Sequence, residues 1–245
     1  MAGAGSRFSS EGYKDPKPLI LINGIPMIRL VIENLKPMCP HRFIFICQRE
    51  HVERYELRKK LGKWAPNCEI IEIDGITEGA ACTVLEAASL INNEHELMIA
   101  NSDQYIDIDI NDYLKLIDGN GVDGLIMTMK ASDEKWSYIG LDVNGEINRV
   151  VEKEVISDEA TVGIYNFSKG SEFVSAALEM IADNERVNGE FYVAPVYNNL
   201  IRAGATIRYF NIGEEHNGMH GLGTPSDLQA FLKLPLSIAV TGKIV

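Results

Sequence analysis

Short apolar runs alternate with amphipathic stretches along the first half of the chain. Four runs are typical of buried β-strands, because they are short, apolar and rich in β-branched residues. These runs are Phe43–Cys47, Glu69–Ile73, Glu96–Ala100 and Gly124–Lys130. The stretches between them predict helices at Met27–Leu35, His51–Leu61, Ala80–Ile91 and Ile110–Leu116. This alternation predicts an α/β fold of three layers (α/β/α), in which helices cover both faces of a mixed, mostly parallel, Rossmann-like sheet.

The pattern changes after residue 130. Shorter strands joined by turns are predicted at Ser137–Val143, Glu146–Glu152 and Ala160–Phe167. Two helices, a strand and a further helix follow, at Glu172–Ala182, Val193–Ala203, Thr206–Ile212 and from Thr224 onward. Because no linker, repeat or low-complexity segment interrupts the chain, we expect one domain over residues 1–245, with halves 1–130 and 131–245.

Composition narrows the class of protein. Apolar residues make up 46% and charged residues 24% of the 245 residues, which is ordinary for a globular domain. No apolar run is long enough for a membrane helix, and Met1–Phe8 lacks the apolar core of a signal peptide. The four cysteines form no C-x-x-C pair, so reduced thiols are expected rather than disulfides or zinc. We therefore expect a cytoplasmic enzyme without a membrane partner.

The net charge limits the partners. The chain has 23 Lys and Arg residues against 35 Asp and Glu residues, a formal charge of −12. An overall basic field for DNA or RNA is absent, so no nucleic-acid partner is expected. An anionic ligand would need a local group of cations, or a metal ion held by carboxylates.

A glycine-rich loop opens the chain. Met1–Phe8 reads MAGAGSRF, and Lys17-Pro18-Leu19 follows it. Glycines allow backbone N–H groups to approach phosphate oxygens, and Arg7 and Lys17 would add positive charge there. A flexible terminus is the alternative. Since such a loop normally follows a buried strand, either that strand lies upstream of Met1 or the first strand is built differently.

Asp103 is the candidate metal ligand. It follows the apolar run Glu96–Ala100, at the carboxyl end of a strand where ligands of parallel sheets gather. A carboxylate at this place suits Mg²⁺, which takes one or two protein carboxylates together with phosphate oxygens and waters. The alternative is an Asp that caps a turn. Asp107 and Asp109 form a D-x-D motif, which we interpret as part of a loop and the start of the next helix.

These residues resemble a known family. The A-G-x-G-x-R and K-P-L motifs are similar to the signature of the sugar-phosphate nucleotidylyltransferases, which have a glycosyltransferase-A-like fold. The resemblance covers essentially the whole chain. Its further matches, in the right order, are Ser102-Asp103, Glu152-Lys153, Thr161–Tyr165, Gly189-Glu190 and Gly221–Thr224.

The resemblance implies roles for individual residues, with residues 1–130 binding the nucleotide and residues 131–245 the acceptor. The implied catalytic residues are Arg7, Lys17 and Asp103, and Asp103 would hold Mg²⁺. The implied nucleotide-binding residues are Ala2, Gly3, Gly5, Ser6, Arg7, Lys17, Glu78, Gly79 and Ser102. The implied acceptor-binding residues are Gly140, Lys153, Thr161 and Glu190.

One departure concerns the second metal ligand. Many relatives carry an Asp just before the Gly-Thr pair near the C-terminus, whereas this chain has Gly221 there. His220, Asp227 or Glu190 would then serve as the second metal ligand, or water alone would fill that place.

The resemblance also implies the reaction. Within the family the chain is most similar to small capsule-type cytidylyltransferases, including phosphoglutamine cytidylyltransferases. We therefore expect transfer of CMP from CTP to a small phosphorylated acceptor, with release of pyrophosphate, for capsule or surface-polysaccharide precursors. The alternatives are a uridylyl- or thymidylyltransferase acting on a sugar 1-phosphate, a glycosyltransferase that uses a nucleotide-sugar, and a non-catalytic nucleotide-binding regulator. A monomer and a homodimer both remain open.

Overall fold

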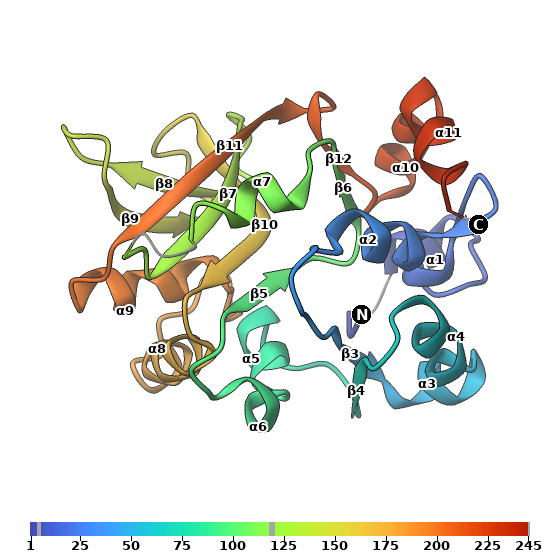
Figure 1. The fold of residues 1–245 in the computed structure, drawn as a ribbon, viewed down its shortest axis with the longest axis horizontal. Helices are drawn as coiled ribbons and strands as arrows, with labels where there is room; N and C mark the ends of the chain where they lie inside the picture. Colours follow the sequence, from blue (N-terminus) through green and yellow to red (C-terminus); the bar gives the residue numbers. More distant parts are fainter. Residues whose placement is uncertain (4–5, 118–120, 245) are drawn as a thin grey trace. The chain divides into compact units, whose positions relative to one another are not determined.

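The computed structural model describes residues 1–3, 6–117 and 121–244, with Ser6 described in its backbone only (Figure 1). The chain divides into two compact units. The first unit comprises Met1–Ile76, Asn101–Asn111 and Glu215–Val245, and the second comprises Thr77–Ala100 and Asp112–Glu214. Each unit contains segments from both sides of residue 130. The assignment of the halves 1–130 and 131–245 to nucleotide and acceptor stays a prediction.

The first unit is built around three pairs of short strands and the helices beside them, among the described residues. Its helices are α1 (Ser6–Ser10), η1 (Lys17–Leu19), α2 (Met27–Leu35), α3 (Arg49–Arg54), α4 (Leu57–Trp64), α10 (Pro225–Leu232) and α11 (Pro235–Thr241). Its strands are β1 (Leu21–Ile22), β2 (Ile25–Pro26), β3 (Ile44–Gln48), β4 (Glu69–Ile73), β6 (Gln104–Ile106) and β12 (Gly218–Gly221). The short helix α7 (Ile110–Leu114) begins in this unit and continues into the second.

Besides the short antiparallel pair β1–β2, the first unit contains the pairs β3–β4 and β6–β12. β3 and β4 are parallel and in register from Ile44 opposite Glu69 to Gln48 opposite Ile73, so their carboxyl ends lie at one edge. β6 and β12 are antiparallel, with Tyr105 opposite His220. The core of this unit joins segments from both ends of its chain. It contains Phe8, Ile20, Ile22, Met27, Leu30, Tyr105, Leu222, Leu228, Phe231 and Val240.

The second unit contains a larger sheet. Its strands are β5 (Leu97–Ala100), β7 (Gly124–Lys130), β8 (Ser137–Leu141), β9 (Ile147–Glu152), β10 (Glu159–Phe167) and β11 (Ile207–Glu215). Its helices are α5 (Ala80–Leu85), α6 (Ala88–Ile91), α8 (Gly170–Ala182), η2 (Ala194–Val196) and α9 (Tyr197–Arg202).

The long strand β10 lies at the centre of this sheet. All nine of its residues are buried, and it pairs antiparallel with β5, β7 and β8. β7 pairs parallel with β11, and β8 and β9 form an antiparallel hairpin. Tyr197 of α9 stacks on Phe167 of β10 at 4.6 Å and donates a hydrogen bond to the Asn166 carbonyl at 2.8 Å. The predicted α/β class with a mixed sheet is confirmed.

Several predicted helices are shorter or divided in the structure. The helix predicted at His51–Leu61 is divided into α3 and α4, because Glu56 has a left-handed conformation with φ 51°. The helix predicted at Ala80–Ile91 is divided into α5 and α6 at Glu86-Ala87. The helix predicted at Val193–Ala203 consists of η2 followed by α9.

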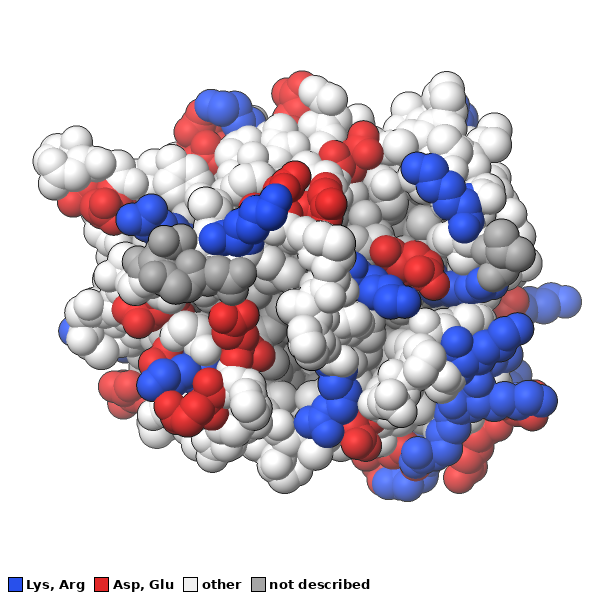
Figure 2. Space-filling view, in the orientation of Figure 1, with Lys and Arg blue, Asp and Glu red and all other residues white. Residues whose placement is uncertain are grey.

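The surface of the first unit carries a group of cations. Figure 2 shows Lys and Arg side chains gathering over α4, where Arg58, Lys59 and Lys63 are exposed. Within the described residues, no helix is both long enough and apolar enough to cross a bilayer.

Candidate active site

A lysine and an aspartate 86 positions apart form the centre of the site in the first unit. Lys17 Nζ lies 2.6 Å from Asp103 Oδ2, and the two side chains are 27% and 24% exposed. Lys17 begins η1, whose next residues Pro18 and Leu19 are buried and hold this turn in place. The structure therefore brings together two of the three predicted catalytic residues, a cation and a carboxylate, with both still accessible to a ligand.

The approach to Asp103 depends on a glycine. The Asp103 carbonyl accepts a hydrogen bond from the Leu222 amide at 2.8 Å, which ties the turn before β6 to the segment after β12. A Cβ on Gly223 would lie only 2.6 Å from Asp103 Oδ2. Any larger residue at position 223 would therefore displace the carboxylate. This is a physical reason for the glycine in the Gly221–Thr224 motif.

The first residues of the chain are held by a side chain that the sequence analysis did not identify. Gln48, the last residue of β3, donates from Nε2 to the Ala2 carbonyl at 2.6 Å and to the Gly75 carbonyl at 2.7 Å. One amide thus links the glycine-rich loop to the loop that follows β4. A polar residue at the carboxyl end of a parallel strand was the available signal.

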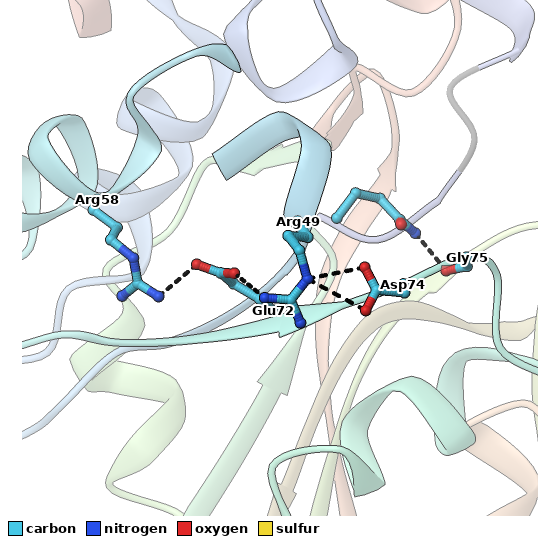
Figure 3. Close-up of polar contacts among 6 residues, drawn as sticks. Arg49, Arg58, Glu72, Asp74 and Gly75 are labelled. Atoms are coloured by element: carbon cyan, nitrogen blue, oxygen red, sulfur yellow. Dashed lines mark hydrogen bonds and ion pairs between the residues drawn. The ribbon is translucent and has the colours of Figure 1, made fainter. Parts of the chain in front are cut away.

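A network of ion pairs fixes the loop after β4 (Figure 3). Arg49 contacts Asp74 through Nε at 3.0 Å and Glu72 through Nη1 at 2.8 Å. Glu72 also accepts from Arg58 Nη2 at 2.5 Å. Hydrogen bonding to Asp74 raises the pKa of Arg49, so this guanidinium stays charged. The network extends from α4 to the residue beside Gly75, and so it supports the partner of Gln48.

A cavity of about 220 Å³ adjoins the Lys17–Asp103 pair. The described residues that line it include Ala2, Gly3 and Ser102, three of the predicted nucleotide-binding residues, together with Lys17. The others are Met1, Ser9, Tyr13, Lys14, Asp15, Pro16, Pro18, His51 and Tyr55. Backbone groups, cations and hydroxyls therefore share one concave surface, which suits an anionic ligand.

Arg7 is not among these lining residues. It is exposed on α1, a short helix that is anchored by Phe8, whose ring meets the Tyr13 ring edge-on at 5.1 Å. Ser6 begins this helix, and Gly5 lies outside the described residues. The predicted roles of Arg7, Gly5 and Ser6 stay predictions.

In the second unit, Lys153 is held by a tyrosine. Lys153 Nζ donates to Tyr192 Oη at 2.6 Å and lies 4.7 Å from the centre of that ring. This hydrogen bond raises the pKa of Lys153, so the ammonium stays charged. The backbone at Lys153 is left-handed, with φ 57°, and its amide donates to the Trp136 carbonyl at 3.0 Å. Tyr192 is a second residue that the sequence analysis did not identify.

Buried polar side chains lie in the strands beside Lys153. Glu152 accepts a hydrogen bond from Ser137, and burial raises the pKa of its carboxyl. Thr161 Oγ1 and Tyr165 Oη lie 2.8 Å apart in the buried strand β10. A Cβ on Gly140 would lie 2.8 Å from the Arg149 side chain, so this glycine has a packing role in the β8–β9 hairpin.

Packing against Phe191 and an ion pair with Arg186 explain the residue types at Glu78 and Gly79. A Cβ on Gly79, whose φ is 137°, would lie 2.4 Å from the Phe191 carbonyl oxygen. Phe191 also accepts from the Ala81 amide at 3.0 Å and donates to the Glu78 carbonyl at 2.9 Å. The Glu78 carboxylate lies 2.5 Å from Arg186 Nη2. The predicted acceptor residue Glu190 directly precedes Phe191 and is exposed, so it shares this loop.

The residues around Gly221 bear on the second metal ligand. His220 is buried between the rings of Tyr105 and Phe231, and burial lowers its pKa. A Cβ on Gly221 would lie 3.5 Å from Asp227 Oδ2, which places that carboxylate beside the position where the family resemblance implies an Asp. Within the described residues, no three His, Cys, Asp or Glu side chains gather as a protein cage for a metal. The Asp103 carboxylate would hold Mg²⁺ together with phosphate oxygens and waters, and this metal role stays a prediction.

Comparisons with known proteins identify the family of the chain. The family model of the nucleotidyl transferases matches residues 1–196. The chain belongs to this nucleotidyl transferase family. No curated protein matches it.

Three solved structures are similar over nearly the whole chain. A nucleoside-diphosphate-sugar pyrophosphorylase from Vibrio cholerae RC9 is 26% identical, with a TM-score of 0.83 over 96% of this chain and 98% of its own. A putative glucose-1-phosphate thymidylyltransferase from Bacillus anthracis is 18% identical, with a TM-score of 0.74 over 100% and 94%. An inositol-1-phosphate CTP transferase from T. maritima is 15% identical, with a TM-score of 0.70 over 99% and 93%. The last two show the shared fold. The predicted superfamily is confirmed.

Proposed function

We propose that this nucleotidyl transferase moves a nucleoside monophosphate from an NTP to the phosphate of a small acceptor and releases pyrophosphate. The observation that carries the proposal is the Lys17–Asp103 pair at 2.6 Å beside a cavity that Ala2, Gly3 and Ser102 line. Such a surface offers backbone N–H groups and an ammonium to a polyphosphate, together with a carboxylate.

The chemistry needs positioning more than proton transfer. The attacking acceptor phosphate is already an anion at neutral pH, so it needs no general base. The enzyme must hold two anions that repel each other and stabilise the charge that develops on pyrophosphate. Lys17 supplies positive charge at this place, and Asp103 orients the ammonium. Mg²⁺, which Asp103 would hold, supplies further neutralisation of the phosphate oxygens when it is bound.

The acceptor site belongs to the second unit in this proposal. Lys153 binds the acceptor phosphate, and its contact with Tyr192 keeps the ammonium charged and directed. Gly140, Thr161 and Glu190 shape the remaining wall, as the family resemblance implies. Burial raises the pKa of the neighbouring Glu152 carboxyl, which accepts a hydrogen bond from Ser137.

CTP is the first candidate for the nucleotide, because the chain resembles capsule-type cytidylyltransferases. UTP or dTTP with a sugar 1-phosphate is the second. A glycosyltransferase reaction that uses a nucleotide-sugar would depend on Asp107 and Asp109. In the structure, Asp109 Oδ1 caps α7 by accepting from the Asn111 amide at 2.9 Å. This cap favours the transferase that uses an NTP. The capsule setting, the location in the cytoplasm and a homodimer stay predictions.

Pyrophosphate release tests the proposal. The four NTPs and dTTP are each combined with Mg²⁺ and a panel of phosphate monoesters: sugar 1-phosphates, glycerol phosphate, phosphocholine and phosphorylated amino-acid amides. We expect turnover that requires both an NTP and one acceptor class and that is lost in Lys17→Ala. Turnover of a nucleotide-sugar without pyrophosphate release would instead support the glycosyltransferase.

A further inference from the structure

We propose that His51, Tyr55 and Lys14 form a diphosphate subsite, which holds the β- and γ-phosphates of the NTP and then the departing pyrophosphate. The inference rests on the proposed function and adds residues that no motif in the sequence marked.

The subsite begins with the position of α3. This helix starts directly after β3, at the carboxyl edge of the β3–β4 pair. His51 and Tyr55 lie one turn apart, and the Tyr55 amide donates to the His51 carbonyl at 3.1 Å. Their rings meet edge-on, with centroids 5.9 Å apart and planes at 73°. The two side chains therefore form one preorganised surface, and both line the cavity beside Lys17.

The Tyr55 ring also contacts the side chain of Arg54. The Arg54 guanidinium lies 5.4 Å from the ring centroid, within the range of a cation–π contact. A ring held on one side by His51 and contacted by Arg54 loses little further freedom when its hydroxyl binds a ligand. Tyr55 and His51 are both half-buried, so a ligand in the cavity can contact them at modest desolvation cost.

The chemistry of the cavity favours an anion with several oxygens. Lys14 and Lys17 bring two positive charges to the lining, and Asp15 brings one negative charge. The His51 imidazole and the Tyr55 hydroxyl add N–H and O–H donors, and Gly3 also lines the cavity. Hydrogen bonds to charged phosphate oxygens are stronger than those between neutral groups.

The size of the cavity fits this ligand. Its volume is about 220 Å³. One water needs about 15 Å³ on this measure, so the cavity has room for a diphosphate of nine heavy atoms with some solvent. Because Ser102, the neighbour of Asp103, lines the same cavity, a diphosphate here would continue directly from the Lys17–Asp103 pair.

Titration calorimetry with inorganic pyrophosphate and Mg²⁺ tests the subsite directly, without knowledge of the nucleotide or the acceptor. We expect pyrophosphate binding to be weakened about tenfold by His51→Leu and by Tyr55→Phe, the loss expected for one hydrogen bond to a charged group. The matched control is His41→Leu, which removes an exposed histidine of the same unit and should leave the affinity unchanged.

Lys14→Ala gives a second, independent test. Its side chain is exposed, so its removal leaves the fold intact, which a thermal unfolding midpoint verifies. We expect at least threefold weaker pyrophosphate binding. An affinity within twofold of wild type in folded Lys14→Ala, or in folded His51→Leu and Tyr55→Phe, would overturn the inference, as would a wild-type protein that does not bind pyrophosphate.

The two proposals can fail separately. If pyrophosphate binds as described but no NTP is turned over in the screen, the proposed function fails and the subsite stands. If the screen detects pyrophosphate release while these variants bind pyrophosphate normally, the function stands and the subsite fails.

Discussion

The substitution Gly223→Ala tests whether the position of the Asp103 carboxylate determines activity. The added Cβ would lie 2.6 Å from Asp103 Oδ2 and 3.4 Å from its Cγ. The carboxylate oxygen must therefore retreat by roughly 1 Å to restore an ordinary contact. Gly223 does not have a positive φ, so alanine is compatible with the backbone itself.

The expected loss is large for activity and small for stability. A retreat of this size breaks the 2.6 Å contact with Lys17 Nζ. A misplacement of about 1 Å at a reacting centre costs on the order of 10²-fold in rate, or about 2.7 kcal/mol of transition-state stabilisation. The Asp103 side chain is partly exposed, and a partly exposed ion pair contributes little to stability, so the free energy of unfolding should change by less than about 1 kcal/mol.

The assay compares two glycines that are two positions apart. The ratio kcat/KM for pyrophosphate release is measured for Gly223→Ala and for Gly221→Ala, together with urea unfolding of both. A Cβ at Gly221 would make only ordinary contacts, 3.5 Å from Asp227, so this control should keep activity within about threefold of wild type. A folded Gly223→Ala variant that is as active as the Gly221→Ala control would refute the reasoning.

Three further predictions concern the cation, a packing glycine and the buried histidine. Lys17→Ala or Asp103→Ala should each lower kcat/KM by an amount equal to at least about 3 kcal/mol of transition-state stabilisation, by analogy with removal of one preorganised donor. A loss of kcat/KM below about tenfold in steady-state assays would contradict the roles of these residues. Gly79→Ala should lower the free energy of unfolding by about 3 kcal/mol, because the added Cβ would lie 2.4 Å from the Phe191 carbonyl oxygen and because the φ of this residue disfavours alanine. A urea unfolding curve identical to that of wild type would contradict this packing role. Burial lowers the pKa of His220, so the unfolded chain binds a proton more readily than the folded one. Stability should therefore fall as the pH drops below the ordinary value of 6.5, and His220→Phe should remove this contribution; parallel stability–pH curves for wild type and variant exclude it.

The sequence pattern was sufficient to locate most elements. The runs at Glu69–Ile73 and Gly124–Lys130 are β4 and β7 with the predicted bounds, and Met27–Leu35 is α2. These segments are short, apolar and bounded by turn residues, so local periodicity alone specifies them. The family signature likewise placed Lys17 and Asp103 in one site, because the resemblance covers the whole chain.

The tertiary structure decided how the strands pair. β10 is buried along its whole length between β7 on one side and β5 and β8 on the other, all antiparallel, while β7 also pairs parallel with β11. Periodicity reports which residues are buried but not which strand covers them, so these partners were not readable from the pattern.

Local conformation and long-range contacts decided the rest. The break between α3 and α4 at Glu56 has no proline or glycine to mark it. Gln48, His51, Tyr55 and Tyr192 belong to no motif, and each gains its significance from a partner or cavity that only the folded backbone supplies. Side chains that are distant in the sequence can act on the same ligand only when the fold brings them close together. The sequence pattern does not report these distances in space.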